Sequence, residues 1–149
     1  MSTYTQILYQ IVFCPKHRAP CLKKEGREEL FKHIAGLIKN KNCHLYRING
    51  VEDHIHILTH LHPTVALSTL VQCIKVSSSN FIKETQLFPD FQGWQNGYCA
   101  ITYSNSALNN LIEYVKNQEA HHKKLTSKDE LLLALEENNI QYGDLPEFM

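Results

Sequence analysis

The sequence predicts an α+β fold, in which helices cover one face of a four-stranded antiparallel sheet and further helices follow at the C-terminus. Two observations support this prediction. Along the chain, the spacing of apolar residues changes between the period of two of a strand and the longer period of a helix. The predicted helices follow the first and third strands, which gives the order βαββαβ. This order is typical of ferredoxin-like, or RRM-like, sheets.

The predicted strands are short segments rich in β-branched, aliphatic and aromatic residues. The first alternates from Tyr4 to Phe13. The dipeptide Asn49-Gly50 favours a tight turn, so we expect the chain to reverse there, between the second and third strands. The four strands are expected at 4–13, 43–49, 53–61 and 97–103.

The predicted helices are segments in which apolar residues fall on one side of a helix. They are expected at 24–40, 65–84 and 106–122. Thr126-Ser127 opens a last helix, where Ser127 and Glu130 have the spacing of a capping box. We expect one domain over residues 1–149, because a chain of this length can form a single hydrophobic core.

Composition favours a cytoplasmic protein. No stretch reaches the roughly 18 apolar residues that cross a bilayer, so we expect no membrane partner, and the N-terminus has no signal segment. The five cysteines include no Cys-x-x-Cys pair, which favours buried, reduced thiols over disulfides or a zinc site.

The charges are unevenly distributed, although their sum is zero. Residues 1–50 carry nine Lys and Arg against three acidic residues, whereas residues 125–149 carry one against six. A local excess of positive charge can attract phosphate over a screening length of about 8 Å, even on a neutral protein. On charge alone, a solvated charged helix is as well supported as a surface that binds phosphate. The acidic C-terminal segment has no assigned role.

A His-x-His pair lies in the third predicted strand. Alternate residues of a strand share a face, so His54 and His56 should project together, about 7 Å apart along the strand. Two such imidazoles can bind one metal ion. His60 shares their face but should lie about 13 Å beyond His56, too far to bind the same ion.

Polar residues follow one side of the helix predicted at 106–122. Tyr114, Gln118 and His121 follow one another at intervals of about one turn, beside an apolar stripe. A tyrosine at the edge of a core is common, but an amide one turn away is a poor packing residue and a suitable oxygen ligand. The combination predicts a nucleophilic Tyr114, activated by Mg²⁺ or Mn²⁺ bound to His54, His56 and Gln118, with the histidines favouring Mn²⁺.

The chain resembles the HUH-type single-tyrosine transposases of insertion sequences and the related transposases associated with repetitive palindromes. The resemblance extends over nearly the whole sequence. It includes the basic loop at 16–20, the segment 49–58 with its two histidines, the helix around 70–79, Trp94-Gln95-Asn96-Gly97-Tyr98, and Tyr114 to Gln118 with His121-His122. Glu52 stands where a proline is common in these proteins.

This resemblance implies a bacterial, DNA-associated homodimer that binds hairpins in single-stranded DNA. Tyr114 would cleave the strand, form a 5′-phosphotyrosine and leave a 3′-OH, and the reverse step would rejoin DNA. The family's metal ligands would be His54, His56 and Gln118. Stacking and phosphate contacts would recognise the hairpin, and the candidate cations are Lys16, Arg18, Lys75 and Lys123.

Two other functions remain open from the sequence. The first is a domesticated protein that binds hairpins without cutting them. The second is an HUH nickase of the replication or relaxase type, which is less favoured because those chains usually carry further domains. A histidine-triad hydrolase is excluded because Leu58 stands at the position of the third histidine.

Overall fold

The computed structural model describes residues 2–122 and 125–141. Four strands form one antiparallel sheet: β1 (Leu8–Phe13), β2 (His44–Val51), β3 (His54–His60) and β4 (Cys99–Tyr103), in the order β2-β3-β1-β4. Helices α1 (Lys24–Asn40) and α2 (Leu67–Thr85) connect these strands in the predicted βαββαβ order. The helices α3 (Leu108–Lys116), α4 (Gln118–His121) and α5 (Ser127–Glu137) follow.

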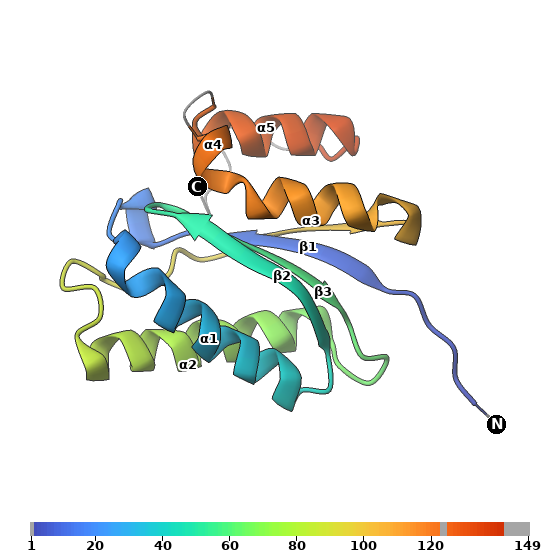
Figure 1. Ribbon diagram of the computed structural model, residues 1–149, viewed down its shortest axis with the longest axis horizontal. Coiled ribbons are helices and arrows are strands. Elements are labelled where there is room, and N and C mark those ends of the chain that lie inside the picture. The colour runs from blue at the N-terminus through green and yellow to red at the C-terminus, as the bar shows by residue number, and fades with distance from the viewer. Residues whose placement is uncertain (1, 123–124, 142–149) are drawn as a thin grey trace.

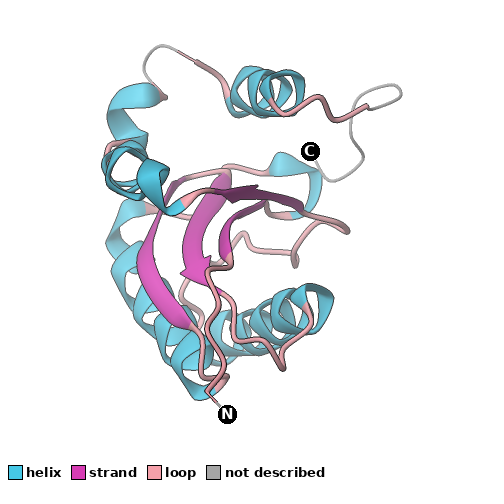
Figure 2. Ribbon diagram, turned by 90° about the vertical axis from the view of Figure 1, so that its right-hand side faces the viewer, coloured by secondary structure: helices cyan, strands magenta, loops and turns pink. Residues whose placement is uncertain are grey.

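The sheet lies between two layers of helices (Figure 1). Helices α1 and α2 cover one face, and α3, α4 and α5 lie over the other, as the view turned by 90° also shows (Figure 2). The ferredoxin-like α+β fold is therefore confirmed, with the additional C-terminal helices on the second face.

The larger core lies between the sheet and the first two helices. It joins inward-facing residues of the central strands, such as Ile11 and Ile57, to Leu30, Ile34 and Ile74 of the helices. A smaller cluster joins Val12, Cys99 and Ile101 of the sheet to Leu131 and Leu135 of α5. Because alternate strand residues point to opposite faces, β1 contributes Ile11 to one core and Val12 to the other.

Several predicted boundaries were wrong. Strand β1 begins at Leu8 rather than Tyr4, and β4 begins at Cys99, after Gly97 with a φ of 87°. The turn between β2 and β3 lies at Glu52-Asp53, because Asn49 and Gly50 remain paired within the sheet, opposite His56 and Ile55.

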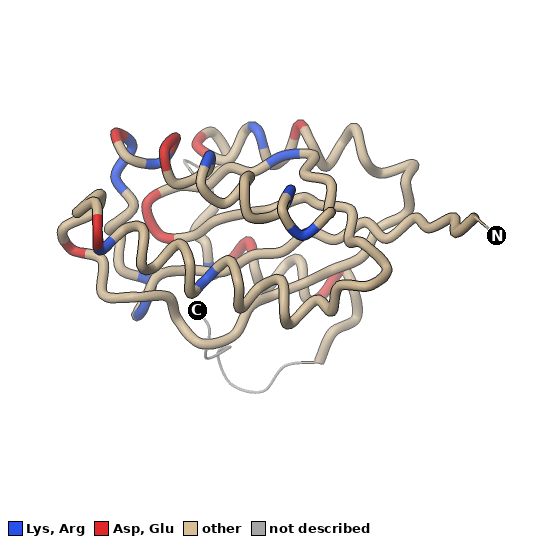
Figure 3. The backbone as a smooth tube through the Cα atoms, turned by 90° about the horizontal axis from the view of Figure 1, so that it is seen from below, with Lys and Arg blue, Asp and Glu red and all other residues tan. Residues whose placement is uncertain are grey.

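The surface carries both signs of charge. Seen from below, the backbone positions of Lys and Arg and those of Asp and Glu are both spread over several segments (Figure 3). No disulfide joins the five cysteines, all of which lie in the described ranges, and four of them are buried. Among residues 2–122 and 125–141, no helix is both long and apolar enough to cross a membrane.

Candidate functional site

The site begins with the two histidines of β3. His54 and His56 are both buried, at 1% and 2% exposed, and their ring centroids are 4.9 Å apart. Both line a small cavity of about 30 Å³ between the sheet and the C-terminal helices. Alternation along β3 therefore places two imidazoles side by side at the second face of the sheet.

His54 is oriented by the preceding residue. The Nδ1 atom of its ring lies 2.8 Å from Oδ1 of Asp53, whose Oδ2 accepts a hydrogen bond from the Ser127 hydroxyl at 2.9 Å. Burial lowers the pKa of His54, but the bonds to Asp53 and Glu130 outweigh it and raise the pKa to about 9. A carboxylate on one ring nitrogen directs the other nitrogen toward the cluster, as in many metal-binding histidines.

Gln118 is fully buried and reaches the same place from α4. Its Oε1 lies 3.3 Å from Nε2 of His54. The predicted continuous helix 106–122 was wrong, since α3 ends at Lys116 and Asn117 has non-helical dihedral angles (φ −97°, ψ 26°). Asn49 of β2 donates a hydrogen bond of 2.9 Å to the carbonyl of Lys116, which satisfies a backbone group freed by this break.

Tyr114 lies beside the histidines within the same chain. Its ring centroid is 6.0 Å from that of His56 and 4.6 Å from that of His121, and its side chain lines the 30 Å³ cavity with His54 and His56. Burial, and secondarily the neighbouring Glu130 carboxylate, raise the pKa of Tyr114 above its ordinary value. The phenol is therefore protonated at neutral pH in this arrangement.

Glu130 is a further residue of the site, and the sequence pattern did not predict it there. Its Oε1 lies 2.6 Å from Nε2 of His56 and 3.4 Å from Nε2 of His54. The predicted capping box is wrong, because the Thr126 hydroxyl caps α5 by accepting from the amide of Asp129 at 3.1 Å. Its position could have indicated a role in the site, because Glu130 lies on the same buried side of α5 as Leu131 and Leu135.

His122 also belongs to the cluster, although the resemblance gave it no role. Its ring centroid lies 4.4 Å from that of His54, and its Nε2 lies 3.7 Å from Oε2 of Glu130. Ligand atoms of His54, His122 and Glu130 all lie within 4.8 Å of one another. The described residues thus contain a buried group of imidazole, carboxylate and amide atoms that could hold a metal ion.

The predicted DNA contacts other than Lys123 gather around one pair of loops. The loop at 14–18 is tied to the loop at 93–97 by hydrogen bonds of 2.9 Å from the amide of Lys16 to the carbonyl of Gly93, and from the amide of Gln95 to that of Cys14. Lys16 is exposed and Arg18 is partly exposed on the first loop. Lys123 lies outside the described residues.

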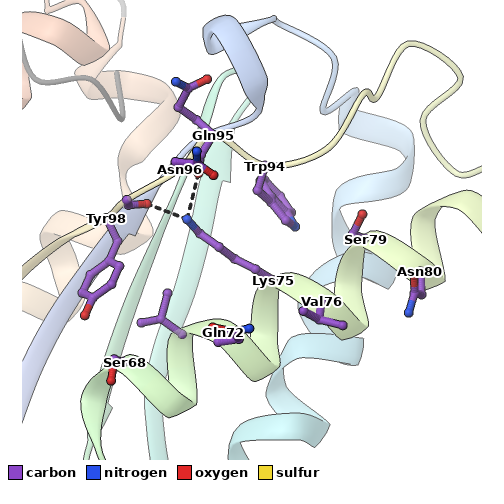
Figure 4. Close-up of a pocket in the computed structure, with 12 residues that line it drawn as sticks. Ser68, Gln72, Lys75, Val76, Ser79, Asn80, Trp94, Gln95, Asn96 and Tyr98 are labelled. Atoms are coloured by element: carbon purple, nitrogen blue, oxygen red, sulfur yellow. Dashed lines mark hydrogen bonds between the residues drawn. The ribbon is translucent and has the colours of Figure 1, made fainter.

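Lys75 holds the second loop from α2. Its ammonium donates to the carbonyls of Gln95 at 2.8 Å and Gly97 at 2.5 Å, as the dashed lines of Figure 4 show. It lines a pocket of about 560 Å³ together with Trp94, Asn96 and Tyr98. Lys75 therefore has a structural role in this loop, and its predicted contact with DNA stays a prediction.

Fold and site together define an α+β protein that carries a tyrosine beside a candidate metal centre. The sequence model described as "Transposase IS200 like" matches residues 3–118, which is most of the chain. The chain belongs to this family of transposases and is thus a DNA-processing enzyme by family.

Relatives of known identity agree with this assignment. The chain is 24% identical over 118 residues to the ISDra2 transposase TnpA of Deinococcus radiodurans, with 76% of this chain and 84% of the relative covered. It is 27% identical over 117 residues to the transposase of insertion sequence element IS200 of Salmonella typhimurium, with 74% and 75% covered.

Two solved structures share the fold. A putative transposase from Deinococcus radiodurans superposes with a TM-score of 0.63 at 20% identity, covering 79% of this chain and 95% of the other. A REP-associated tyrosine transposase bound to a REP hairpin gives a TM-score of 0.60 at 13% identity, covering 99% and 95%. The second match also includes the C-terminal region, which the family model does not cover.

Proposed function

We propose that this transposase cleaves and rejoins single-stranded DNA at hairpin-bearing ends, with Tyr114 as the nucleophile. A divalent cation, Mg²⁺ or Mn²⁺, would bind His54, His56 and Gln118. The observation that carries the proposal is the 6.0 Å separation of the Tyr114 and His56 rings, which places a phenol and the histidine pair around one cavity.

The chemistry follows from the groups around this cavity. Attack by the Tyr114 hydroxyl oxygen would form a bond to the scissile phosphorus and break the bond to the 3′ oxygen. The phenol gives up one proton and the leaving 3′ oxygen takes up one, so the products are a 5′-phosphotyrosine and a 3′-OH with no net change in protons. When bound, the cation would polarise the phosphate and stabilise charge on the leaving oxygen. The reverse attack by a 3′-OH would rejoin DNA without an external energy source.

The linked loops at 14–18 and 93–97 are the proposed entry for DNA. Residue Cys14 directly follows β1, whose last residue, Phe13, pairs with Ile55 beside His54. Lys16 and Arg18 are thus held close to the end of the strand that carries the metal ligands. The structurally similar REP-associated transposase is bound to a hairpin, which supports hairpin DNA as the partner of this chain.

We further propose that residues 1–149 form one catalytic domain and that the enzyme acts as a homodimer. Two ends of an element must be held together for rejoining, and two copies of one domain would supply one site for each end. Both proposals rest on the assignment to the transposase family, together with the resemblance described above.

The central test uses Tyr114→Phe, which removes only the hydroxyl. The wild-type protein, incubated with flanking genomic DNA as single strands and Mn²⁺, should form a covalent adduct that survives denaturing electrophoresis. Tyr114→Phe should bind the hairpin with unchanged affinity and form no adduct. Tyr103→Phe is the matched control, since Tyr103 lies on β4 and shares a neighbouring pocket with Tyr114 but does not line the cavity that holds His54 and His56. An adduct with Tyr114→Phe would contradict the assignment of the nucleophile.

Removal of a proposed ligand tests the metal. We expect His56→Ala to abolish cleavage at all practical concentrations of Mg²⁺ while it still binds the hairpin. If the wild-type protein binds hairpins tightly and never cuts them under any of these conditions, the chain is a domesticated binding protein instead.

A further inference from the structure

Helix α5 inserts a carboxylate into the proposed metal centre. Glu130 is 7% exposed, and its two oxygens face three imidazoles that come from two separate segments of the chain. Oε1 lies 2.6 Å from Nε2 of His56 and 3.4 Å from Nε2 of His54, and Oε2 lies 3.7 Å from Nε2 of His122. Burying a carboxylate is unfavourable unless partners compensate the charge, so this position requires a physical reason.

The compensation among the described residues is incomplete. Nε2 of His122 and Oε2 of Glu130 are both buried, and within residues 2–122 and 125–141 neither has a hydrogen-bond partner. These two atoms face each other at 3.7 Å, which is too long for a hydrogen bond. A cation bound between imidazole and carboxylate atoms would satisfy both, and it would replace the proton that now joins His56 to Glu130.

The position of α5 is fixed independently of Glu130. Ser127 donates to Asp53 at 2.9 Å, and Leu131 and Leu135 pack on Val12, Cys99 and Ile101 of the sheet. Glu130 lies between these anchors, so the helix holds its carboxylate in the cluster rather than leaving it on a free surface. Such support is what a metal ligand requires.

We propose that Glu130 and His122 are metal ligands in addition to His54 and His56, and that this set selects a first-row transition ion such as Mn²⁺ over Mg²⁺. Three imidazoles favour such ions, whereas Mg²⁺ prefers oxygen ligands and retains its waters. Gln118, whose amide oxygen is 3.3 Å from Nε2 of His54, would remain a ligand of the same ion, as in the proposed function. This inference rests on the proposed function and defines its cofactor.

The test measures metal binding directly, without DNA. Isothermal titration of the full chain with Mn²⁺ and with Mg²⁺ would be made for the wild type, Glu130→Gln and Glu137→Gln. The last variant makes the same chemical change on the same helix at an exposed position. We expect the wild type to bind Mn²⁺ at least about tenfold more tightly than Mg²⁺. Glu130→Gln should weaken Mn²⁺ binding by about tenfold or more, while Glu137→Gln binds as the wild type does.

A second variant covers the case in which Glu130→Gln does not fold. His122→Asn should also weaken Mn²⁺ binding, and it should reduce the rise in melting temperature that Mn²⁺ produces in the wild type. The visible spectrum of bound Co²⁺ should change in both variants, because each removes a ligand.

Three results would overturn the inference. Equal Mn²⁺ affinity of Glu130→Gln and the wild type would remove Glu130 from the ligand set. Tighter binding by Glu130→Gln would mean that the carboxylate blocks the centre, and equal affinity of the wild type for Mg²⁺ and Mn²⁺ would refute the selectivity. If Mn²⁺ binds through Glu130 but no DNA adduct forms, the proposed function fails while this inference stands.

Discussion

The nearest carboxylate differs between the two histidines of β3. Asp53 contacts Nδ1 of His54, and Glu130 contacts Nε2 of His56. The two carboxylates differ in origin, since Asp53 is the neighbour of His54 in the chain, whereas Glu130 comes from α5, 74 residues from His56. The contact with Asp53 orients the His54 imidazole, and the contact with Glu130 joins α5 to the histidines of β3.

The role of Asp53 can be tested by Asp53→Asn. Asparagine keeps the shape and an acceptor oxygen but loses the charge that holds the His54 ring. Because outer partners of metal-binding histidines contribute about 10–100-fold to metal affinity, we expect Mn²⁺ binding to weaken by about tenfold or more. Calorimetric titration measures this change, and hairpin binding should be unaffected.

Asp90→Asn is the control for this substitution. It makes the same chemical change at an exposed position outside the cluster. Unchanged Mn²⁺ affinity in Asp53→Asn, or an equal loss in Asp90→Asn, would show that Asp53 does not act by orienting His54.

At the level of single residues, the sequence predicts what is local and misses what is distant. Strand alternation placed His54 and His56 on one face, and helical spacing placed Gln118 near Tyr114. The contact of Glu130 with His56 depends on how α5 packs, and its spacing from Ser127 also fitted a capping box. The local sequence did not distinguish a capping residue from a residue of the site, except that Glu130 is a charged residue beside a run of leucines.

The pairing of β2 with β3 depends on a glycine at the level of the element. A β-carbon at Gly50 would collide with the carbonyl oxygen of His54, so only glycine allows the two strands to approach here. This approach fixes the register that pairs Val51 with His54 and Asn49 with His56. The sequence pattern identified Gly50 as a turn residue. In the structure, Gly50 is needed instead for the close approach of β2 and β3.

Gly50→Ala should destabilise the protein and displace His54. We expect the free energy of unfolding to fall by about 1–3 kcal/mol, as for other substitutions that overpack a core. Denaturation in urea measures this loss. The matched control is Gly36→Ala in α1, where an added β-carbon meets nothing within 4 Å. That variant should gain about 0.5–1 kcal/mol, because alanine favours a helix interior. Equal stability of Gly50→Ala and the wild type would refute the argument from close approach.

The break between α3 and α4 shows the limit of prediction for an element. The helical spacing of Tyr114, Gln118 and His121 continued across Asn117, so the sequence favoured one helix over 106–122. In the structure, the side chain of Asn49 meets the carbonyl of Lys116, and α3 ends there. A hydrogen bond between residues 67 positions apart cannot be read from helical periodicity. Boundaries of this kind depend on tertiary contacts rather than on propensity.

At the scale of the whole molecule, the sheet separates the larger hydrophobic core from the candidate site. The face covered by α1 and α2 contains the larger core, and the face covered by α3, α4 and α5 contains the histidines, Glu130 and Tyr114 (Figure 1). The order of strands and helices along the chain was predictable because each predicted strand and helix had a clear period. The docking of α5 was not predictable, since the smaller core joins it to β1 and β4, far away in the sequence.

This arrangement predicts that a proposed homodimer uses Tyr114 within its own subunit. The tyrosine and His56 rings are 6.0 Å apart in one chain, so no partner is needed to bring them together. Mixed dimers of Tyr114→Phe and His56→Ala would contain an intact site only if the tyrosine crosses between subunits. We therefore expect the mixture, refolded together and incubated with hairpin DNA and Mn²⁺, to form no more covalent adduct than either variant alone. Recovery of about a quarter or more of the wild-type adduct would mean that the subunits exchange their tyrosine helices, since random mixing makes half of the dimers mixed, each with one intact site.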